Sequence, residues 1–209
     1  MSQDEIKVRI DSQNREEDAW RALLEFINQC DKDSAELFHP SQQFQLDHWV
    51  HIRTLPKEIG KLKSIKHLMI YGSNLTRLPQ EIGQLEALEK FTPYTSYGLR
   101  WFPYEITRCS NLKDCTVSTR ALFGNYKNKK GFPNLNDNPV DYFGGNKCSI
   151  CDTNENDIRF EQYWVSCQVA TDVLPLLVIV CSDECFHKIK EPASGYSIVP
   201  HKGGNAIKR

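Results

Sequence analysis

The chain has 209 residues, of which 25% are charged and 40% hydrophobic, and its formal net charge at pH 7 is −1. This composition is that of an ordinary globular protein, and it points to no enzyme class. The polar N-terminus lacks the apolar core of a secretion signal, and no apolar run approaches the roughly 18 residues of a membrane span. We therefore expect a cytoplasmic protein without membrane contact, in which the eight cysteines stay reduced.

The first of three expected domains, residues 1–43, contains an amphipathic helix. Apolar residues recur there at the spacing of one helix face, namely Trp20, Leu23, Leu24 and Ile27. The simplest use of this stripe is to cap the repeat array that follows, and docking onto a partner helix is the alternative. Cys30 lies just past the stripe with no nearby cysteine, so we expect it to be structural.

An eight-residue motif then occurs twice. LPKEIGKL begins at Leu55 and LPQEIGQL begins at Leu78, 78 − 55 = 23 residues later; a degenerate copy, FPYEITRC, begins at Phe102, a further 102 − 78 = 24 residues on. A fixed period in the twenties indicates stacked repeats, each of which buries its apolar edge only against its neighbours. The apolar positions of the best-defined unit are Ile65, Leu68, Ile70, Leu75 and Leu78.

This pattern resembles the leucine-rich repeat family, in its L-P-x-x-I-x-x-L subtype, over residues 44–135, with Ser73 in the slot usually held by asparagine. The resemblance implies an α/β solenoid of about four coils, with a short strand at residues 68–70. The outer units fit with one extra residue each, and the first of them is expected to use Phe44, Leu46, Ile52 and Leu55. Cys109 and Cys115 occupy leucine slots and are expected to be small core residues.

The strands of such coils expose alternate side chains on a concave face. The expected partner-binding residues are His67, Met69, Tyr71, Thr92, Tyr94 and Thr116. The same pattern adds Gln43, Gln45, Asp47, Lys90, Asp114 and Ser118 to the exposed set. Aromatic side chains with a polar group favour a protein partner, whereas an ordinary polar sheet face without any partner is the alternative. Trp49, Trp101 and Tyr97 at the loop edge either extend this surface or pack against the next module.

The repeats are locally basic, with 14 lysines and arginines against 7 acids in residues 44–135. Nucleic-acid binding is therefore an alternative function. Most of the lysines fall at solvent positions of the convex segments, however, where a solvated charged face is the ordinary expectation. We therefore favour a protein partner over nucleic acid.

Four cysteines in the third expected domain, residues 136–209, follow the pattern C-x2-C-x29-C-x3-C, formed by Cys148, Cys151, Cys181 and Cys185. Two such pairs complete the tetrahedral shell of a structural zinc ion. Two strands are expected between the pairs and a helix after Cys181, an order that resembles a treble-clef zinc module over residues 146–191. Alternatives are a redox pair, or replacement of one cysteine by His187 or His201. Cys167 is expected in the hairpin core.

The sequence contains no His-Asp-Ser set, P-loop or G-x-G-x-x-G, and the two cysteine pairs leave no open position on a metal for catalysis. We therefore expect a protein-interaction module that is not an enzyme and that binds no cofactor besides zinc. The alternatives are nucleic-acid binding and a dedicated inhibitor of a toxin or an enzyme. The identity of the protein partner does not follow from the sequence.

Overall fold

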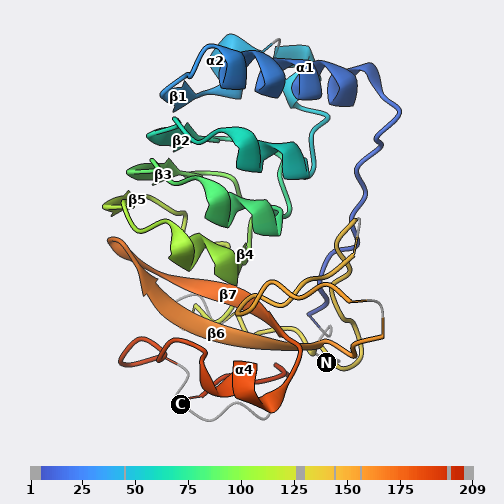
Figure 1. Cartoon of the computed structure of the whole chain (residues 1–209), viewed down its shortest axis with the longest axis vertical. Coiled ribbons are helices and arrows are strands. Elements are labelled where there is room, and N and C mark those ends of the chain that lie inside the picture. Colours follow the sequence, from blue (N-terminus) through green and yellow to red (C-terminus); the bar gives the residue numbers. More distant parts are fainter. Residues whose placement is uncertain are drawn as a thin grey trace.

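The computed structural model describes residues 6–44, 46–125, 130–143, 145–155, 157–196 and 199–204. The architecture is mixed α/β, with one parallel sheet, one mixed sheet and few α-helices (Figure 1). Short strands stack along one side of the molecule, short helices stack along the other, and a long hairpin crosses the lower end. Among the described residues, no helix combines the length and the apolar character that crossing a bilayer requires.

Helix α1 (Asp18–Lys32) covers the upper end of the stack, as Figure 1 shows. Its inward face buries Ala19, Trp20, Leu23, Ile27 and Cys30. Asp18 in the first turn and Lys32 in the last turn match the polarity of the helix dipole. The predicted helix and its apolar stripe are confirmed, with Leu24 half-buried at the edge of the stripe.

The parallel sheet has the strand order β1 (Leu37–Phe38), β2 (His67–Met69), β3 (Lys90–Thr92) and β5 (Asp114–Cys115). The strand register aligns one core side chain from each, namely Phe38, Leu68, Phe91 and Cys115. The 3-10 helices η1 (Lys57–Lys61), η2 (Gln80–Gln84) and η3 (Tyr104–Arg108) stack on the opposite side. The 23- and 24-residue period therefore returns the chain to the same register at each turn.

The expected strand of the first repeat unit was misplaced, although Phe44, Ile52 and Leu55 are buried as expected. Its strand is β1 rather than a segment around residues 43–47, because Phe38 fills the core position beside Leu68. The longer path of 68 − 38 = 30 residues accommodates helices α2 (Pro40–Gln43) and α3 (Leu46–Trp49). Pro40 favours this outcome, since proline is well suited to the first turn of a helix. Gln43 and Asp47 consequently lie in helices, and Gln45 falls outside the described residues.

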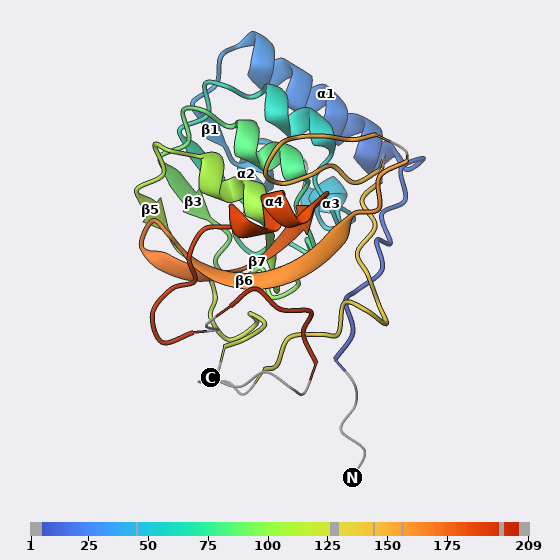
Figure 2. The ribbon, with the colours of Figure 1, turned by 60° about the horizontal axis from the view of Figure 1, so that its bottom comes forward.

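A long antiparallel hairpin closes the other end of the stack. It consists of β6 (Glu161–Val169) and β7 (Asp172–Val180), as the apolar runs predict. Strand β4 (Phe102–Pro103), from the third turn of the stack, pairs in parallel with β7 at Leu176 and Leu177. Figure 2 shows β6 and β7 as a curved ribbon beneath the stack, with α4 (Asp183–His187) beside them. The hairpin therefore joins the stack by backbone hydrogen bonding as well as by side-chain packing.

One hydrophobic core runs from Trp20 in α1 to Val178 in β7. A second cluster surrounds the fully buried Trp164 and includes Val8 and Trp101. Trp101 contacts Trp164 edge-on at 6.0 Å between ring centroids, so it packs against the C-terminal segment instead of extending an exposed surface. The expected domain boundary between residues 135 and 136 is thus crossed by continuous packing, and it stays a prediction.

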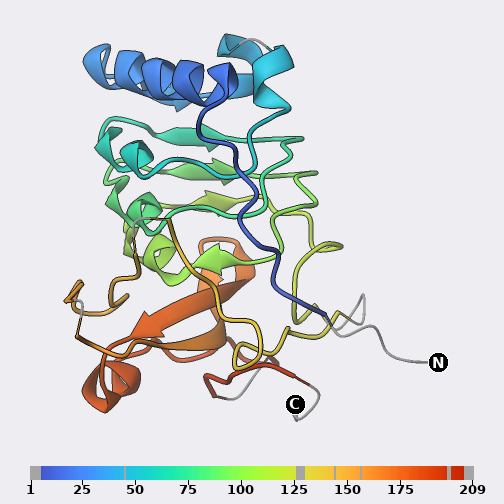
Figure 3. The same ribbon diagram turned by 90° about the vertical axis from the view of Figure 1, so that its right-hand side faces the viewer.

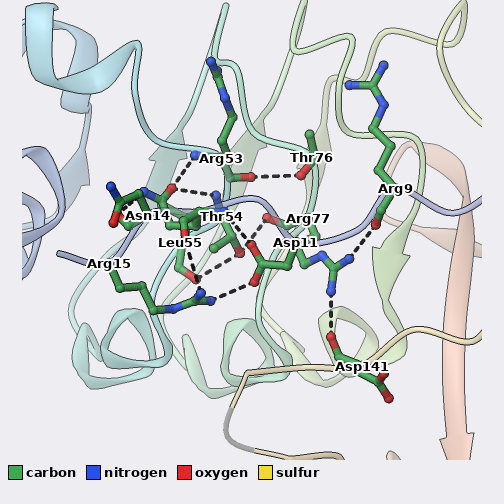
Figure 4. A network of polar contacts seen from close by, with 11 residues as sticks. Arg9, Asp11, Asn14, Arg15, Arg53, Thr54, Leu55, Thr76, Arg77 and Asp141 are labelled. Atoms are coloured by element: carbon green, nitrogen blue, oxygen red, sulfur yellow. Dashed lines mark hydrogen bonds and ion pairs between the residues drawn. The ribbon is translucent and has the colours of Figure 1, made fainter. Parts of the chain in front are cut away.

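The N-terminal segment 6–17, which we call the strap, crosses the turns of the stack and ends near the hairpin (Figure 3). Gln13 accepts hydrogen bonds from the backbone N–H groups of Arg53 (2.6 Å) and Thr54 (3.4 Å). Arg77 donates to the carbonyls of Arg9 (2.7 Å) and Asp141 (2.8 Å), a network drawn in Figure 4. The strap thereby connects repeat units to a segment more than sixty residues further along the chain.

Candidate metal centre and exposed strand face

The four predicted cysteines come together at the open end of the hairpin. The sulfur atoms of Cys148, Cys151, Cys181 and Cys185 all lie within 4.8 Å of one another. Cys148 and Cys185 are buried, Cys181 is half-buried and Cys151 is exposed. Among the described residues this is the one group of three or more histidine, cysteine or acidic side chains close enough to hold a metal ion.

The first cysteine pair lies in a tight loop fixed from both sides. Within the loop, the Asp152 N–H donates to the Cys148 carbonyl at 3.0 Å and the Cys148 N–H donates to the Thr153 carbonyl at 2.8 Å. Ser149 attaches the loop to β7, since its N–H donates to the Ile179 carbonyl and its hydroxyl accepts from the Ile179 N–H. The loop is therefore held to the strand that carries the second pair.

Arg108, at the end of η3, holds the same loop from the side of the stack. Its guanidinium lies 2.9 Å from the Asp152 carboxylate and donates to the Ser149 carbonyl at 2.7 Å. The third repeat turn thus contacts the cysteine loop directly. Sequence reasoning missed Ser149 and Arg108, because neither residue belongs to a recognised spacing and both act only through contacts made in the folded chain.

The second cysteine pair lies at the junction of β7 and α4. Cys181 directly follows the strand, and Cys185 lies in the short helix. The Ser182 hydroxyl caps this helix by accepting from the Cys185 N–H at 3.3 Å. The cap fixes the backbone between the two sulfur atoms, so the second pair faces the first.

The donor set fits one tetrahedral metal ion. A metal–sulfur distance of ~2.3 Å implies sulfur–sulfur edges of roughly 3.8 Å in a tetrahedron. The Cys151–Cys181 and Cys181–Cys185 sulfur distances are 3.5 and 3.7 Å. Four thiols at this separation can hold a soft or borderline metal ion with little rearrangement.

The acidities of the thiols differ within the cluster. The hydroxyl and the backbone of Thr153 lower the pKa of Cys151 to about 6. Removal from water, together with hydrogen bonds to neighbouring cysteines, raises the pKa of Cys181 to about 12. Thiolates are the metal-binding form, so a bound cation would have to favour ionisation of Cys181.

Neither histidine considered as an alternative ligand belongs to the group. His187 is exposed, and its Nδ1 lies 2.6 Å from the Asp183 carbonyl. His201 pairs with the backbone of Trp164 beside the second core cluster, and burial lowers its pKa to about 4. Replacement of a cysteine ligand by either histidine is therefore not needed to complete four donors.

The other four cysteines are free and buried, as predicted. Burial raises the pKa of Cys109 to about 12 and that of Cys167 to about 11, and it also raises the pKa values of Cys30 and Cys115. A thiol that stays protonated is a poor nucleophile and a poor metal ligand. These four residues therefore act as core side chains.

The residues predicted on the strand face either alternate with the core positions along β2 and β3 or lie within two residues of the ends of β2, β3 and β5. Tyr71 and Tyr94 are 49% and 46% exposed and stack with 6.1 Å between ring centroids. The His67 Nε2 atom lies 2.9 Å from the Thr92 hydroxyl, and burial lowers the His67 pKa. Met69 is half-buried and Thr116 is exposed. The structure therefore brings together an aromatic pair flanked by polar groups.

Comparison with protein-family models and with curated proteins found no match for this chain.

Proposed function

We propose that the chain is a non-catalytic leucine-rich repeat protein whose concave strand face binds a protein partner. The observation that carries the proposal is the stacked, half-exposed pair Tyr71 and Tyr94, each two residues beyond the end of adjacent strands β2 and β3. Tyrosines held in place before binding lose little conformational freedom when a partner covers them, and they are frequent at the centres of protein interfaces.

Repeat geometry supports the family proposal. Core positions 68, 91 and 115 are neighbours on adjacent parallel strands, and the 3-10 helices that begin within the LPxEI motifs stack at the same period. Each turn buries its apolar side chains against the next turn, which is the packing expected of stacked repeats.

Charge pairing favours a protein partner over nucleic acid. Four lysines of the repeats form ion pairs with acids of adjacent turns: Lys63 with Glu86, Lys66 with Glu36, Lys90 with Asp114 and Lys113 with Glu89. Phosphate-backbone binding needs a surface of uncompensated cations, and these four lysines each have an acidic partner. A partner that is itself an enzyme or a toxin would make this protein an inhibitor, which the same surface allows.

The test uses a photo-crosslinking amino acid placed at Tyr71 in the full-length chain. We expect capture of a partner from cells by this variant and no capture of the same protein when the crosslinker replaces Lys61, which is exposed on the opposite side in η1. With the captured protein purified, Tyr71→Ala together with Tyr94→Ala should weaken binding by more than about 1 kcal/mol, or roughly fivefold.

Thermal unfolding of the double variant should match the wild type, because both rings are about half exposed in the free chain. If the double variant bound the purified partner as tightly as the wild type does, the strand face would not be the binding site.

We propose that the metal held by the four cysteines is zinc and that its role is structural, in a treble-clef-like module. An all-thiolate tetrahedral shell is typical of structural zinc, and four protein donors leave no position for a substrate or an activated water. Elemental mass spectrometry of protein purified without added metal should find one zinc per chain.

Cys181→Ser should lose that zinc, whereas Cys30→Ala, which removes a buried thiol outside the group, should retain it. A fully folded wild-type preparation with no zinc and four titratable cluster thiols would contradict the proposal.

A further inference from the structure

An open pocket of about 550 Å³ lies where the strap crosses the turns that follow β2 and β3. Three arginines line it, Arg9 from the strap and Arg53 and Arg100 from the stack, and no acidic side chain is among the lining residues. Hydroxyl groups of Thr76, Thr95 and Tyr97 complete its polar wall. Neither the four cysteines nor the stacked tyrosine pair belongs to this pocket.

The repeat explains why two arginines meet there. Arg53, Thr76 and Arg100 occupy one position in three successive units, since 76 − 53 = 23 and 100 − 76 = 24. Thr76 bonds the Arg53 carbonyl through its N–H (2.8 Å) and its hydroxyl (3.1 Å), so the units are in direct contact. Adjacent layers are ~4.8 Å apart, and the two arginine backbones are therefore roughly 10 Å apart. Long side chains at that separation can converge over the short threonine.

These positive charges lack compensation by acids. None of the ion pairs found among the described residues includes Arg9, Arg53 or Arg100. Figure 4 shows the Arg9 and Arg53 side chains extending to the same side of the strap, whereas Asp11 turns toward Arg15. Arg53 donates to the Val50 carbonyl, which is neutral.

Arg100 adds a second observation at this pocket. Its Nε atom is buried without a hydrogen-bond partner. Burial lowers the Arg100 pKa, and the positive charge of Arg9 lowers it further, so the two guanidinium groups repel each other. A cluster of like charges is costly, and one anion between the guanidinium groups would relieve that cost.

We propose that this pocket binds a phosphate group. Guanidinium groups match the oxygens of phosphate with paired hydrogen bonds, and three of them balance a multivalent oxyanion better than a single carboxylate. Tyr97, which is 53% exposed at the rim, offers a surface for whatever the phosphate is attached to. A small phosphorylated molecule and a phosphorylated side chain of a protein share this chemistry.

The experiment is calorimetric titration of the full-length protein with inorganic phosphate and with pyrophosphate, at an ionic strength held constant with chloride. We expect both to bind, with pyrophosphate tighter. Arg53→Gln together with Arg100→Gln should weaken pyrophosphate binding by at least about tenfold, because each arginine supplies charge-assisted hydrogen bonds.

The matched control is Lys61→Gln together with Arg120→Gln, which removes the same charge from exposed positions outside the pocket. Its affinity should equal that of the wild type. Equal weakening in the two double variants, or no binding by the wild type above the chloride background, would overturn the proposal. If the pocket variant unfolds at a lower temperature than the wild type, Arg9→Gln on the exposed strap repeats the test with the same expectation.

Two further titrations are informative. The first distinguishes a small phosphorylated molecule from a phosphorylated protein, and the second tests whether the pocket is independent of the strand face. Tighter binding of a phosphoserine peptide than of pyrophosphate would assign the group to a modified protein, and the reverse order would assign it to a small molecule. The variant Tyr71→Ala with Tyr94→Ala should bind pyrophosphate as the wild type does. Failure of the proposed strand-face function would therefore leave the phosphate proposal unaffected.

Discussion

Two buried serines, Ser73 and Ser96, satisfy backbone groups in the turn after β2. The Ser96 hydroxyl accepts from the Ser73 N–H at 3.0 Å and donates to the Ile70 carbonyl at 2.7 Å. The Ser73 hydroxyl donates to the Ser96 hydroxyl at 2.9 Å. The two serines are 96 − 73 = 23 residues apart and so belong to adjacent units. Because buried backbone groups need partners, this pair stabilises the turn after β2 without a long side chain.

Glu105 is a buried carboxyl group between the stack and the cysteine loop. It is 1% exposed, and its Oε1 accepts from the Gln80 side chain at 2.6 Å, whereas Oε2 has no partner among the described residues. Burial raises its pKa above the ordinary value of 4.5. The folded chain therefore retains a proton at pH values where the unfolded chain has released it.

Glu105→Gln should change how stability depends on pH. With a raised folded-state pKa, the contribution of Glu105 to the free energy of unfolding falls as the pH rises from its unfolded pKa through its folded pKa. Urea unfolding should show that the free energy of unfolding falls more between about pH 5 and about pH 7.5 for the wild type than for the variant. The exposed Glu25→Gln should behave as the wild type, and identical pH profiles for all three proteins would contradict the prediction.

At the scale of elements, β7 contains a proline although it is the central strand of its sheet. Pro175 faces Ser166 of β6, whose carbonyl accepts from the Ala193 N–H at 2.7 Å on the outer edge. Alternate residue pairs of an antiparallel ladder exchange no hydrogen bonds, and Ser166 with Pro175 is such a pair. The missing N–H of the proline therefore removes no bond to β6.

The strap depends on Arg77, which is 3% exposed and donates to the carbonyls of Arg9 and Asp141. A lysine in its place cannot present two donors in the same plane. Arg77→Lys should therefore lower the free energy of unfolding by about 1–3 kcal/mol.

Denaturant titration measures this loss, and limited proteolysis should show earlier cleavage within the strap. The exposed Arg120→Lys is the matched control. A variant as stable as the wild type, with an intact strap, would show that the two hydrogen bonds do not hold this segment.

At the scale of the whole molecule, the cysteine site is connected to the repeats through both backbone and side chains. Strand β7 pairs with β4, Ser149 anchors the cysteine loop on β7, and Arg108 joins that loop to η3. The upper turns around β2 and β3 make none of these contacts directly. Loss of a metal ion bound at the four cysteines should therefore act first on the lower end of the molecule.

Metal removal by a chelator should speed amide hydrogen exchange in β6, β7 and η3 before it does so in β2 and β3. The physical reason is that metal binding supplies folding free energy to the short segments that carry the cysteines. Hydrogen exchange followed by mass spectrometry measures the order, and Cys181→Ser should reproduce it without a chelator. Simultaneous loss of protection in all strands would indicate a single cooperative unit instead.

The sequence by itself determined the parts of this protein that depend on local periodicity. The helix stripe around Leu23, the 23-residue return of Leu68 to Phe91 and the spacing of the cysteine pairs are all legible because neighbouring residues share one geometry. The candidate metal site could therefore be named from spacing, although the residues that hold its loop could not.

Only the tertiary structure decided what depends on segments distant in sequence. The first strand lies at Phe38 rather than near residue 46, because the side chain that fits beside Leu68 is chosen by packing and the irregular first unit has no period to follow. The pairing of β4 with β7 and the approach of Arg9 to Arg100 likewise join residues that no local pattern relates. Such contacts form when the assembled stack brings their surfaces together, so their residues carry no signature in the chain.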